Sequence, residues 1–166
     1  HQALEEISII AAVPNLHLEV PCDSLETKRA TAELLFNVKG PKYVRFAREA
    51  TPVITTQASP YVFGQANVIR YRGEQAKFSE AFEHTLAADY KNEQEQLCLV
   101  SCGPELAEAM RAAYMLKEEY GIETRIINMH TVKPLDKEAV VRAALEIGKI
   151  ITAEEHQVGG FGNLVS

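Results

Sequence analysis

The residues of this chain that could do chemistry follow short apolar runs of the kind that form strands. Glu154, Glu155 and His156 come directly after the apolar run 149–153. A carboxylate beside an imidazole could act as an acid/base pair or bind a metal ion. No second ligand cluster is evident in the sequence, so the interpretation we favour is a polar loop or an interface.

A glycine-rich turn, Gly-Gly-Phe-Gly, follows at 159–162, between this predicted strand and a predicted helix. Backbone N–H groups in such a turn can bind an anion. The spacing fits neither the GxGxxG pattern of dinucleotide-binding turns nor the GxxxxGK pattern of P-loops. We therefore favour a structural turn that lets the helix approach the strand closely.

Two arginines, Arg45 and Arg48, belong to the short predicted strand 43–47 and its end. Their opposite strand parity should direct the side chains to opposite faces, or out of the strand in different ways. An arginine at the carboxyl end of a parallel strand is well placed to bind a phosphate through two hydrogen bonds. From the residues alone, a surface ion pair is an equally good interpretation.

The histidines carry weaker patterns. His1 begins a segment with helical spacing, where an imidazole near the positive end of the helix could exchange hydrogen bonds with a substrate hydroxyl. His130 lies in a strand-to-helix loop with Asp136 as the predicted N-cap, and we favour a hydrogen-bonded structural role for it. His17 and His84 belong to no motif.

The elements that must position these residues form two α/β units. The first unit reads helix, strand, helix, strand, and the capping-box pair Asp23 and Glu26 starts its second helix. Residues 51–64 have prolines, threonines and no helical period, which indicates a linker. After the linker, the predicted strands are 66–71, 97–101, 124–128 and 149–153, and the predicted helices are 78–90, 104–120 and 136–147.

We therefore predict an α/β fold of two three-layer units with mostly parallel sheets. The expected division is 1–50 for the first unit, 51–64 for the linker and 65–166 for the second unit. His1 lies inside a helix-like pattern with no initiating methionine, and Ser166 comes where a new helix is starting. Because domains rarely begin and end within elements, we expect a segment of a longer protein.

Composition excludes several classes of function. Hydrophobic residues make up 46% of the chain and charged residues 24%, as in ordinary globular proteins. The net charge of -6 argues against a nucleic-acid-binding surface, and no apolar run approaches the ~20 residues that span a membrane. Cys22, Cys98 and Cys102 form neither a paired disulfide framework nor a CxxC metal motif, which indicates a reducing, cytoplasmic setting.

Five ordered blocks resemble the transketolase family, in particular its C-terminal half or the C-terminal subunit of split transketolases. The first resembles a THQxxE segment cut after its threonine, and the third resembles a GPxYxRxxR strand. The blocks are 1–7, 13–23, 40–48, 127–136 and 152–162. They run nearly from end to end of the chain, although related enzymes share the last two. The polar segment 73–96 is longer than the usual connection in the family and has no assigned role.

The resemblance implies an enzyme that uses thiamine diphosphate and Mg²⁺ to transfer a two-carbon ketol unit from a ketose phosphate to an aldose phosphate. It implies that His1 contacts the sugar hydroxyls and the reaction intermediate, although some members have glutamine there. It also implies that Arg48 binds the sugar phosphate, whereas Arg45 receives no role.

The same resemblance places the cofactor-activating glutamate and the diphosphate and metal ligands upstream of this chain. We therefore expect no cofactor or metal site in this segment, and we expect it to be inactive alone. Its predicted role is in folding and dimerisation. The predicted partners are an N-terminal cofactor-binding domain or subunit and, in the intact protein, a second copy in a homodimer.

Two related enzymes remain alternatives. A fragment of 1-deoxyxylulose-5-phosphate synthase would share the last two blocks, but the first block and His130 fit transketolase better. The β subunit of a 2-oxoacid dehydrogenase has the same domain pair, but its substrates carry no phosphate for Arg48 to bind. A non-enzymatic folding and dimerisation module is the alternative of a different class.

Overall fold

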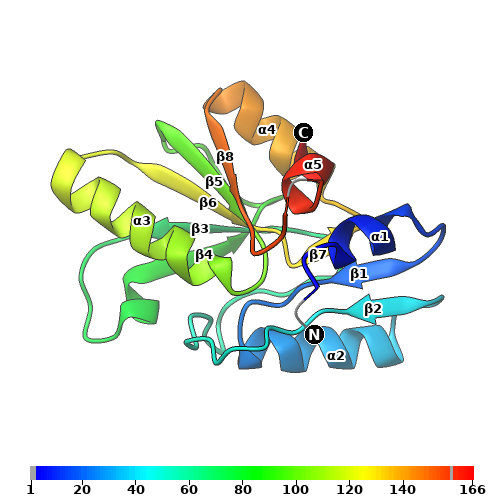
Figure 1. Cartoon of the computed structure of the whole chain (residues 1–166). Coiled ribbons are helices and arrows are strands. Elements are labelled where there is room, and N and C mark those ends of the chain that lie inside the picture. The colour runs from blue at the N-terminus through cyan, green and yellow to red at the C-terminus, as the bar shows by residue number, and fades with distance from the viewer. Residues whose placement is uncertain (1–2, 158) are drawn as a thin grey trace.

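The computed structural model describes residues 3–157 and 159–166 as two sheets with helices packed around them (Figure 1). The elements are α1 (Glu6–Ala12), β1 (His17–Glu19), α2 (Ser24–Phe36), β2 (Lys42–Val44), β3 (Asn67–Tyr71), the 3-10 helix η1 (Phe78–Ala81), β4 (Phe82–Leu86), β5 (Leu97–Ser101), α3 (Glu105–Tyr120), β6 (Thr124–Asn128), β7 (Thr131–Lys133), α4 (Lys137–Glu146), β8 (Ile150–Ala153) and α5 (Phe161–Val165). The predicted α/β class is confirmed.

The smaller sheet has the strand order β2-β1-β7. β1 pairs with β2 in parallel and with β7 in antiparallel orientation. The predicted capping box is confirmed at the start of α2, where Asp23 Oδ1 accepts a hydrogen bond from the Glu26 backbone N–H at 2.9 Å. The sequence predicts a loop over 131–133, but this stretch forms β7 and joins the later part of the chain to the first sheet.

The larger sheet has the order β4-β3-β6-β5-β8. β6, β5 and β8 are parallel, as predicted, but β3 is antiparallel to both of its neighbours. The prediction of a helix over 78–90 is wrong. Phe78 and Phe82 have helical spacing, yet only a 3-10 turn forms there, and Phe82 pairs with Tyr71 across the β3–β4 ladder. Cross-strand packing overrides the local spacing.

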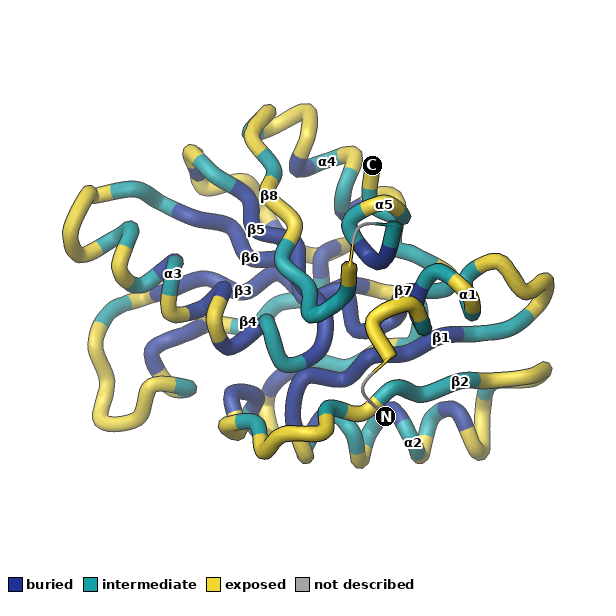
Figure 2. The backbone as a smooth tube through the Cα atoms, viewed as in Figure 1, coloured by how far each residue is buried: buried dark blue, intermediate teal, exposed yellow. Residues whose placement is uncertain are grey.

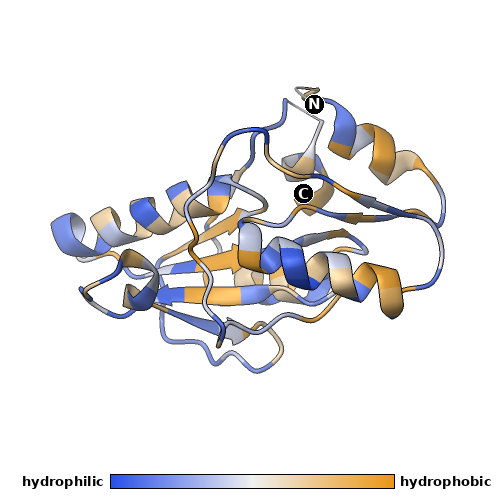
Figure 3. Ribbon diagram, turned by 90° about the horizontal axis from the view of Figure 1, so that it is seen from below, coloured by the Kyte–Doolittle hydropathy of each residue, from blue (hydrophilic) through white to orange (hydrophobic). Residues whose placement is uncertain are grey.

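Two apolar layers cover the two faces of the larger sheet. Consecutive residues of each central strand point to opposite faces, so Val68, Val100 and Ile127 pack toward α1, α4 and α5. Ile69, Leu99 and Ile126 pack toward α3 on the other face. Figure 2 shows β3, β5 and β6 deeply buried and the edge strand β8 partly exposed. Figure 3 shows hydrophobic stretches in the strands at the middle of the larger sheet, and also in parts of the helices.

The segment predicted as a linker is ordered against α2. Asp23 Oδ2 accepts hydrogen bonds from the backbone N–H groups of Ile54 and Thr55, at 2.9 and 2.7 Å. Arg29 donates to the carbonyl oxygens of Thr56 and Ser59, at 2.9 and 2.7 Å. Neither a helix nor a named strand occurs between 51 and 64, which agrees with the predicted lack of period, while the domain boundaries stay a prediction.

None of the helices in the described ranges is long and apolar enough to cross a membrane.

Candidate functional site

Arg45 occupies the point where α1, β2 and the end of β8 meet. Its Nε donates to Glu6 Oε2 at 3.1 Å, and its Nη1 donates to Glu155 Oε2 at 2.9 Å. The Arg45 side chain is 11% exposed. Tyr43 adds a hydrogen bond to the other oxygen of Glu6, at 3.2 Å. For this arginine the ion-pair interpretation is therefore correct, and the pair holds together segments that are far apart in the sequence.

Arg48 differs from Arg45 in its surroundings. It lies three residues further on, is exposed, and makes no hydrogen bond or ion pair with any other residue that the structure describes. Its guanidinium group can therefore take up an anion without first breaking a contact to any of the described residues. The assignment of a sugar phosphate to Arg48 remains a prediction. The other predicted site residue, His1, lies outside the described residues.

The glycine-rich turn holds a carboxylate of the chain itself. Glu154 accepts hydrogen bonds from the backbone N–H groups of Phe161, at 2.5 Å, and Gly162, at 2.7 Å. A Cβ on Gly160 would lie 2.5 Å from Glu154 Oε2, and one on Gly162 would lie 2.8 Å from Thr152 Oγ1. The structural interpretation of this turn is confirmed, because its glycines permit close packing and its N–H groups already have an anionic partner.

The side chain of His156 is only 2% exposed, beside this turn. Its Nδ1 lies 4.0 Å from Glu154 Oε2, which is too far for a hydrogen bond. Burial first, and then the positive charge of Arg45, lower the pKa of His156. The imidazole is therefore mainly neutral at pH 7, and the carboxylate beside it is engaged by backbone groups. The arrangement does not form an acid/base pair.

His130 and Asp136 have the structural roles that we predicted. His130 is fully buried, stacks on Tyr61 at 4.6 Å between ring centroids, and has its Nδ1 3.1 Å from Thr131 Oγ1. Burial lowers the pKa of His130 to about 4. Asp136 caps α4 through Ala139, at 3.1 Å.

Two buried carboxylates with polar partners were not predicted from the sequence. Glu26 accepts hydrogen bonds from Cys22 N, at 2.8 Å, and from Asn128 Nδ2, at 2.7 Å. Burial raises the pKa of Glu26 to about 7. Glu19 accepts hydrogen bonds from Tyr61, and burial raises the pKa of Glu19 as well. The capping-box spacing signalled the local contact of Glu26, but nothing in the sequence signalled a partner 102 residues away.

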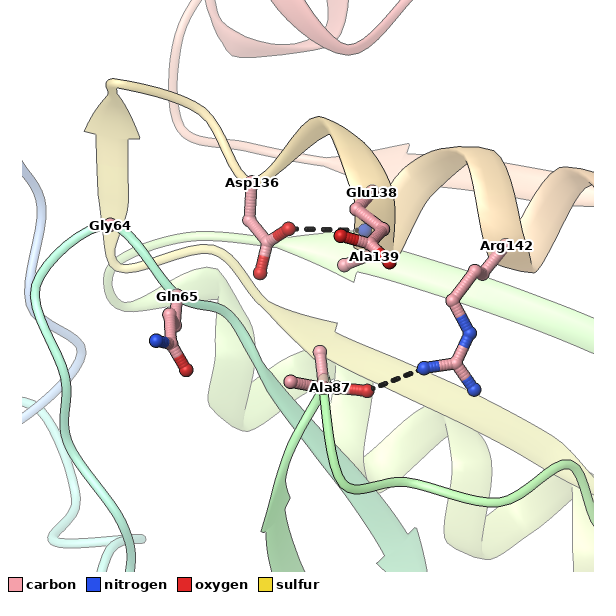
Figure 4. Close-up of a pocket in the computed structure, with 8 residues that line it drawn as sticks. Gly64, Gln65, Ala87, Asp136, Glu138, Ala139 and Arg142 are labelled. Carbon is pink, nitrogen blue, oxygen red and sulfur yellow. Dashed lines mark hydrogen bonds between the residues drawn. The ribbon is translucent and has the colours of Figure 1, made fainter.

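A cavity of about 280 Å³ lies between the start of α4 and the end of β4 (Figure 4). Two of its three charged side chains, Arg142 and Asp136, already have partners within the chain, whereas Glu138 is exposed. Arg142 donates to the carbonyl oxygens of Ala87, at 2.9 Å, and Tyr90, at 2.8 Å. Asp136 caps α4 and also accepts a hydrogen bond from Ala66 N at 2.8 Å. Arg142 and Asp136 are thus committed to structural contacts rather than to a ligand.

The residues that the structure describes include no group of three or more histidine, cysteine, aspartate or glutamate side chains that could hold a metal ion. The backbone N–H groups at the start of α5 already donate hydrogen bonds to Glu154. The described part of the chain therefore does not fit a diphosphate with its metal ion.

Comparisons with known proteins agree with this architecture. Residues 86–166 match the family described as the transketolase C-terminal domain. A solved split-gene transketolase, described as an inactive β4 tetramer, superposes with a TM-score of 0.77 and 30% identity over 99% of this chain and 47% of that chain. Residues 86–166 form a transketolase C-terminal domain, and the chain as a whole is similar to the C-terminal half of transketolases. The predicted resemblance to the C-terminal half of transketolases is confirmed.

Two curated relatives of this chain are named as transketolase subunits. An apulose-4-phosphate transketolase subunit from Phocaeicola vulgatus is 32% identical over 99% of this chain and 46% of its own length. The 6-deoxy-6-sulfo-D-fructose transketolase subunit SqwH from Clostridium sp. is 30% identical over 98% of this chain and 44% of its own length. The chain thus spans about half the length of these relatives.

Proposed function

We propose that this chain is part of a thiamine-diphosphate- and Mg²⁺-dependent transketolase that transfers a two-carbon ketol unit from a ketose phosphate to an aldose phosphate. It acts with an N-terminal cofactor-binding domain or subunit, in a cytoplasmic enzyme that forms a homodimer. The relatives named as transketolase subunits support the need for a partner. The sugar phosphate in the name of one of them supports the substrate class.

The observation that carries the proposal is the difference between the two arginines after β2. Arg45 forms ion pairs with Glu6 and Glu155, so its positive charge is already compensated within the chain. Arg48 is exposed and makes no ion pair within the described residues. A guanidinium group with two N–H groups on one edge can bind a phosphate through paired hydrogen bonds. We therefore assign the sugar phosphate to Arg48. The family resemblance alone assigns the contacts with the sugar hydroxyls to His1.

The chain's own contribution is to bind and orient the sugar. Its described residues do not fit thiamine diphosphate or its metal ion, so we route no chemical step through them. Alone, the chain should be inactive, and its role should be to complete the fold and the dimer of the whole enzyme. Arg45 supports this role because it fixes the segment that leads into Arg48 against α1 and the end of β8.

Reconstitution tests the proposal. The chain is combined with its cofactor-binding partner, thiamine diphosphate and Mg²⁺, and xylulose 5-phosphate and ribose 5-phosphate are supplied. We expect ketol transfer by the combination and none by the chain alone. Decarboxylation of pyruvate in the presence of glyceraldehyde 3-phosphate, without ketol transfer, would instead support the 1-deoxyxylulose-5-phosphate synthase alternative.

A second candidate substrate is a sulfonated ketose. One relative is named for 6-deoxy-6-sulfo-D-fructose, in which a sulfonate is the anionic group. The positive charge of an arginine attracts sulfonate and phosphate alike. In the reconstituted enzyme, the values of kcat/KM for the phosphorylated and the sulfonated ketose decide between the two donors.

A further inference from the structure

The polar segment 73–96, which has no role in the proposed function, forms one wall of a cavity. The cavity measures about 420 Å³ and lies between the end of β3, η1 and the middle of α3. Figure 1 shows this segment, in green, running beside α3. The volume of the cavity falls in the range of small-molecule pockets, ~300–1,000 Å³. We call it the aromatic pocket, and it is lined by Tyr71, Glu74, Gln75, Phe78, Ala81 and Tyr114.

Three aromatic rings form walls of the aromatic pocket, and two of them stand nearly perpendicular to Tyr114. Tyr71 and Tyr114 lie 5.4 Å apart between ring centroids, with an angle of 82° between their planes. Phe78 and Tyr114 lie 6.4 Å apart, at 79°. Phe78 is 39% exposed, so part of this apolar surface stays open to a ligand. Perpendicular rings present a π face and ring edges to the same space, and a π face attracts cations.

The charge around the pocket is negative. Glu74 accepts a hydrogen bond from the Tyr114 hydroxyl at 3.3 Å, and its charge raises the pKa of Tyr114. Burial, followed by the neighbouring Glu118, raises the pKa of Tyr71 to about 12. No lysine or arginine is among the residues that line the pocket in the described part of the chain. Glu74 is thus the charged side chain among the residues that line the pocket.

We propose that the aromatic pocket is a binding site for a small molecule with an alkylated ammonium group. The rings provide π faces, and Glu74 provides a countercharge. A metal ion is a poor fit because Mg²⁺ and Ca²⁺ require several oxygen ligands at once. An alkylated ammonium is weakly hydrated and is the kind of cation that aromatic cages bind. This site is independent of the proposed transferase function.

Choline and its neutral isostere, 3,3-dimethylbutan-1-ol, test the proposal. Both are titrated into the 166-residue chain, and the aromatic resonances of Tyr71, Phe78 and Tyr114 are followed by NMR. We expect saturable binding of choline with a Kd on the order of 1–10 mM, because few contacts are made. The isostere has the same shape without the charge, so it should bind at least about fivefold more weakly.

Two variants locate the site. Glu74→Gln removes the countercharge from an exposed position, and we expect choline to bind about two- to fivefold more weakly. Phe78→Leu removes one ring and should weaken binding by at least a similar factor. Phe36→Leu is the matched control, since Phe36 is 83% exposed on α2 and does not line the pocket. It should leave binding unchanged.

Three results would overturn the proposal. The first is no saturation at concentrations about tenfold above the expected Kd. The second is equal binding of choline and the neutral isostere, which would show an apolar site without preference for charge. The third is a Glu74→Gln variant that binds choline as tightly as the unchanged chain. If Phe78→Leu does not fold, the isostere and Glu74→Gln still decide the question.

Discussion

The Glu154 side chain should stabilise the C-terminal end of the fold. Replacing it tests the structural interpretation of the glycine turn. Glu154 accepts two backbone hydrogen bonds at the start of α5, from Phe161 and Gly162. Phe161 is fully buried and packs into the core. Glu154→Ala therefore leaves two N–H groups without their acceptor, next to a core side chain whose position depends on them.

The expected loss follows from these contacts. A hydrogen bond to a charged group contributes about 1.5–3 kcal/mol when well buried, and an N-cap contributes about 0.5–2 kcal/mol. The Glu154 side chain is 15% exposed, so water can replace part of what is lost. We expect Glu154→Ala to lower the free energy of unfolding by about 1–3 kcal/mol. Glu154→Gln keeps one acceptor oxygen and should lose about half as much.

Urea denaturation followed by circular dichroism at pH 7 measures both variants. Glu138→Ala is the control, because Glu138 is exposed on α4 and should change the free energy of unfolding by less than about 0.5 kcal/mol. A Glu154→Ala variant as stable as this control would refute the reasoning. It would mean that the turn does not depend on its internal carboxylate and is open to an outside anion.

Three further predictions concern the free energy of unfolding, measured by urea denaturation. Arg45→Met should lower it by about 1–3 kcal/mol because Glu6 and Glu155 lose their cation, whereas Arg48→Met, at an exposed position, should lower it by less than about 0.5 kcal/mol. Equal losses would contradict the different roles of the two arginines. The pKa of Glu26 is about 7 in the folded chain against 4.5 for the ordinary side chain, so the folded state binds the proton more tightly and stability should fall as pH rises from about 4.5 to 7. That fall should reach about 1–3 kcal/mol relative to Glu26→Gln, whose side chain does not titrate, and parallel pH profiles of the two proteins would disprove it. Gly160→Ala should destabilise the chain by about 1–3 kcal/mol, measured in the same way, because its Cβ would overlap the Glu154 carboxylate; an unchanged midpoint would show that the turn can shift.

Much of the fold follows from local signals in the sequence. The strands 97–101 and 124–128 match β5 and β6, and Gly121 ends α3 in a left-handed conformation, as a C-terminal glycine predicts. The segment 78–90 fails because Phe78 and Phe82 satisfy a helical spacing and a strand edge equally well. Only the ladder with β3 decides between them, and that contact is not local.

The candidate site was less predictable, for a similar reason. The glycine turn and the residues 154–156 were recognisable, but the use of the Glu154 carboxylate as the partner of the turn was not. The two arginines were distinguished by the family resemblance, since the residues alone gave ion pair and phosphate contact equal weight. Arg45 is separated from Glu155 by 110 residues, and a pairing over that distance leaves no periodic signal in the chain.

The most direct test of the central claim is the KM of the reconstituted enzyme for a phosphorylated and an unphosphorylated ketose, with and without Arg48→Ala. We expect the variant to raise the KM for the phosphorylated ketose by about tenfold or more, since a charge-assisted paired contact is lost. The KM for the unphosphorylated ketose should change little. An equal rise for both ketoses would contradict the assignment of the sugar phosphate to Arg48.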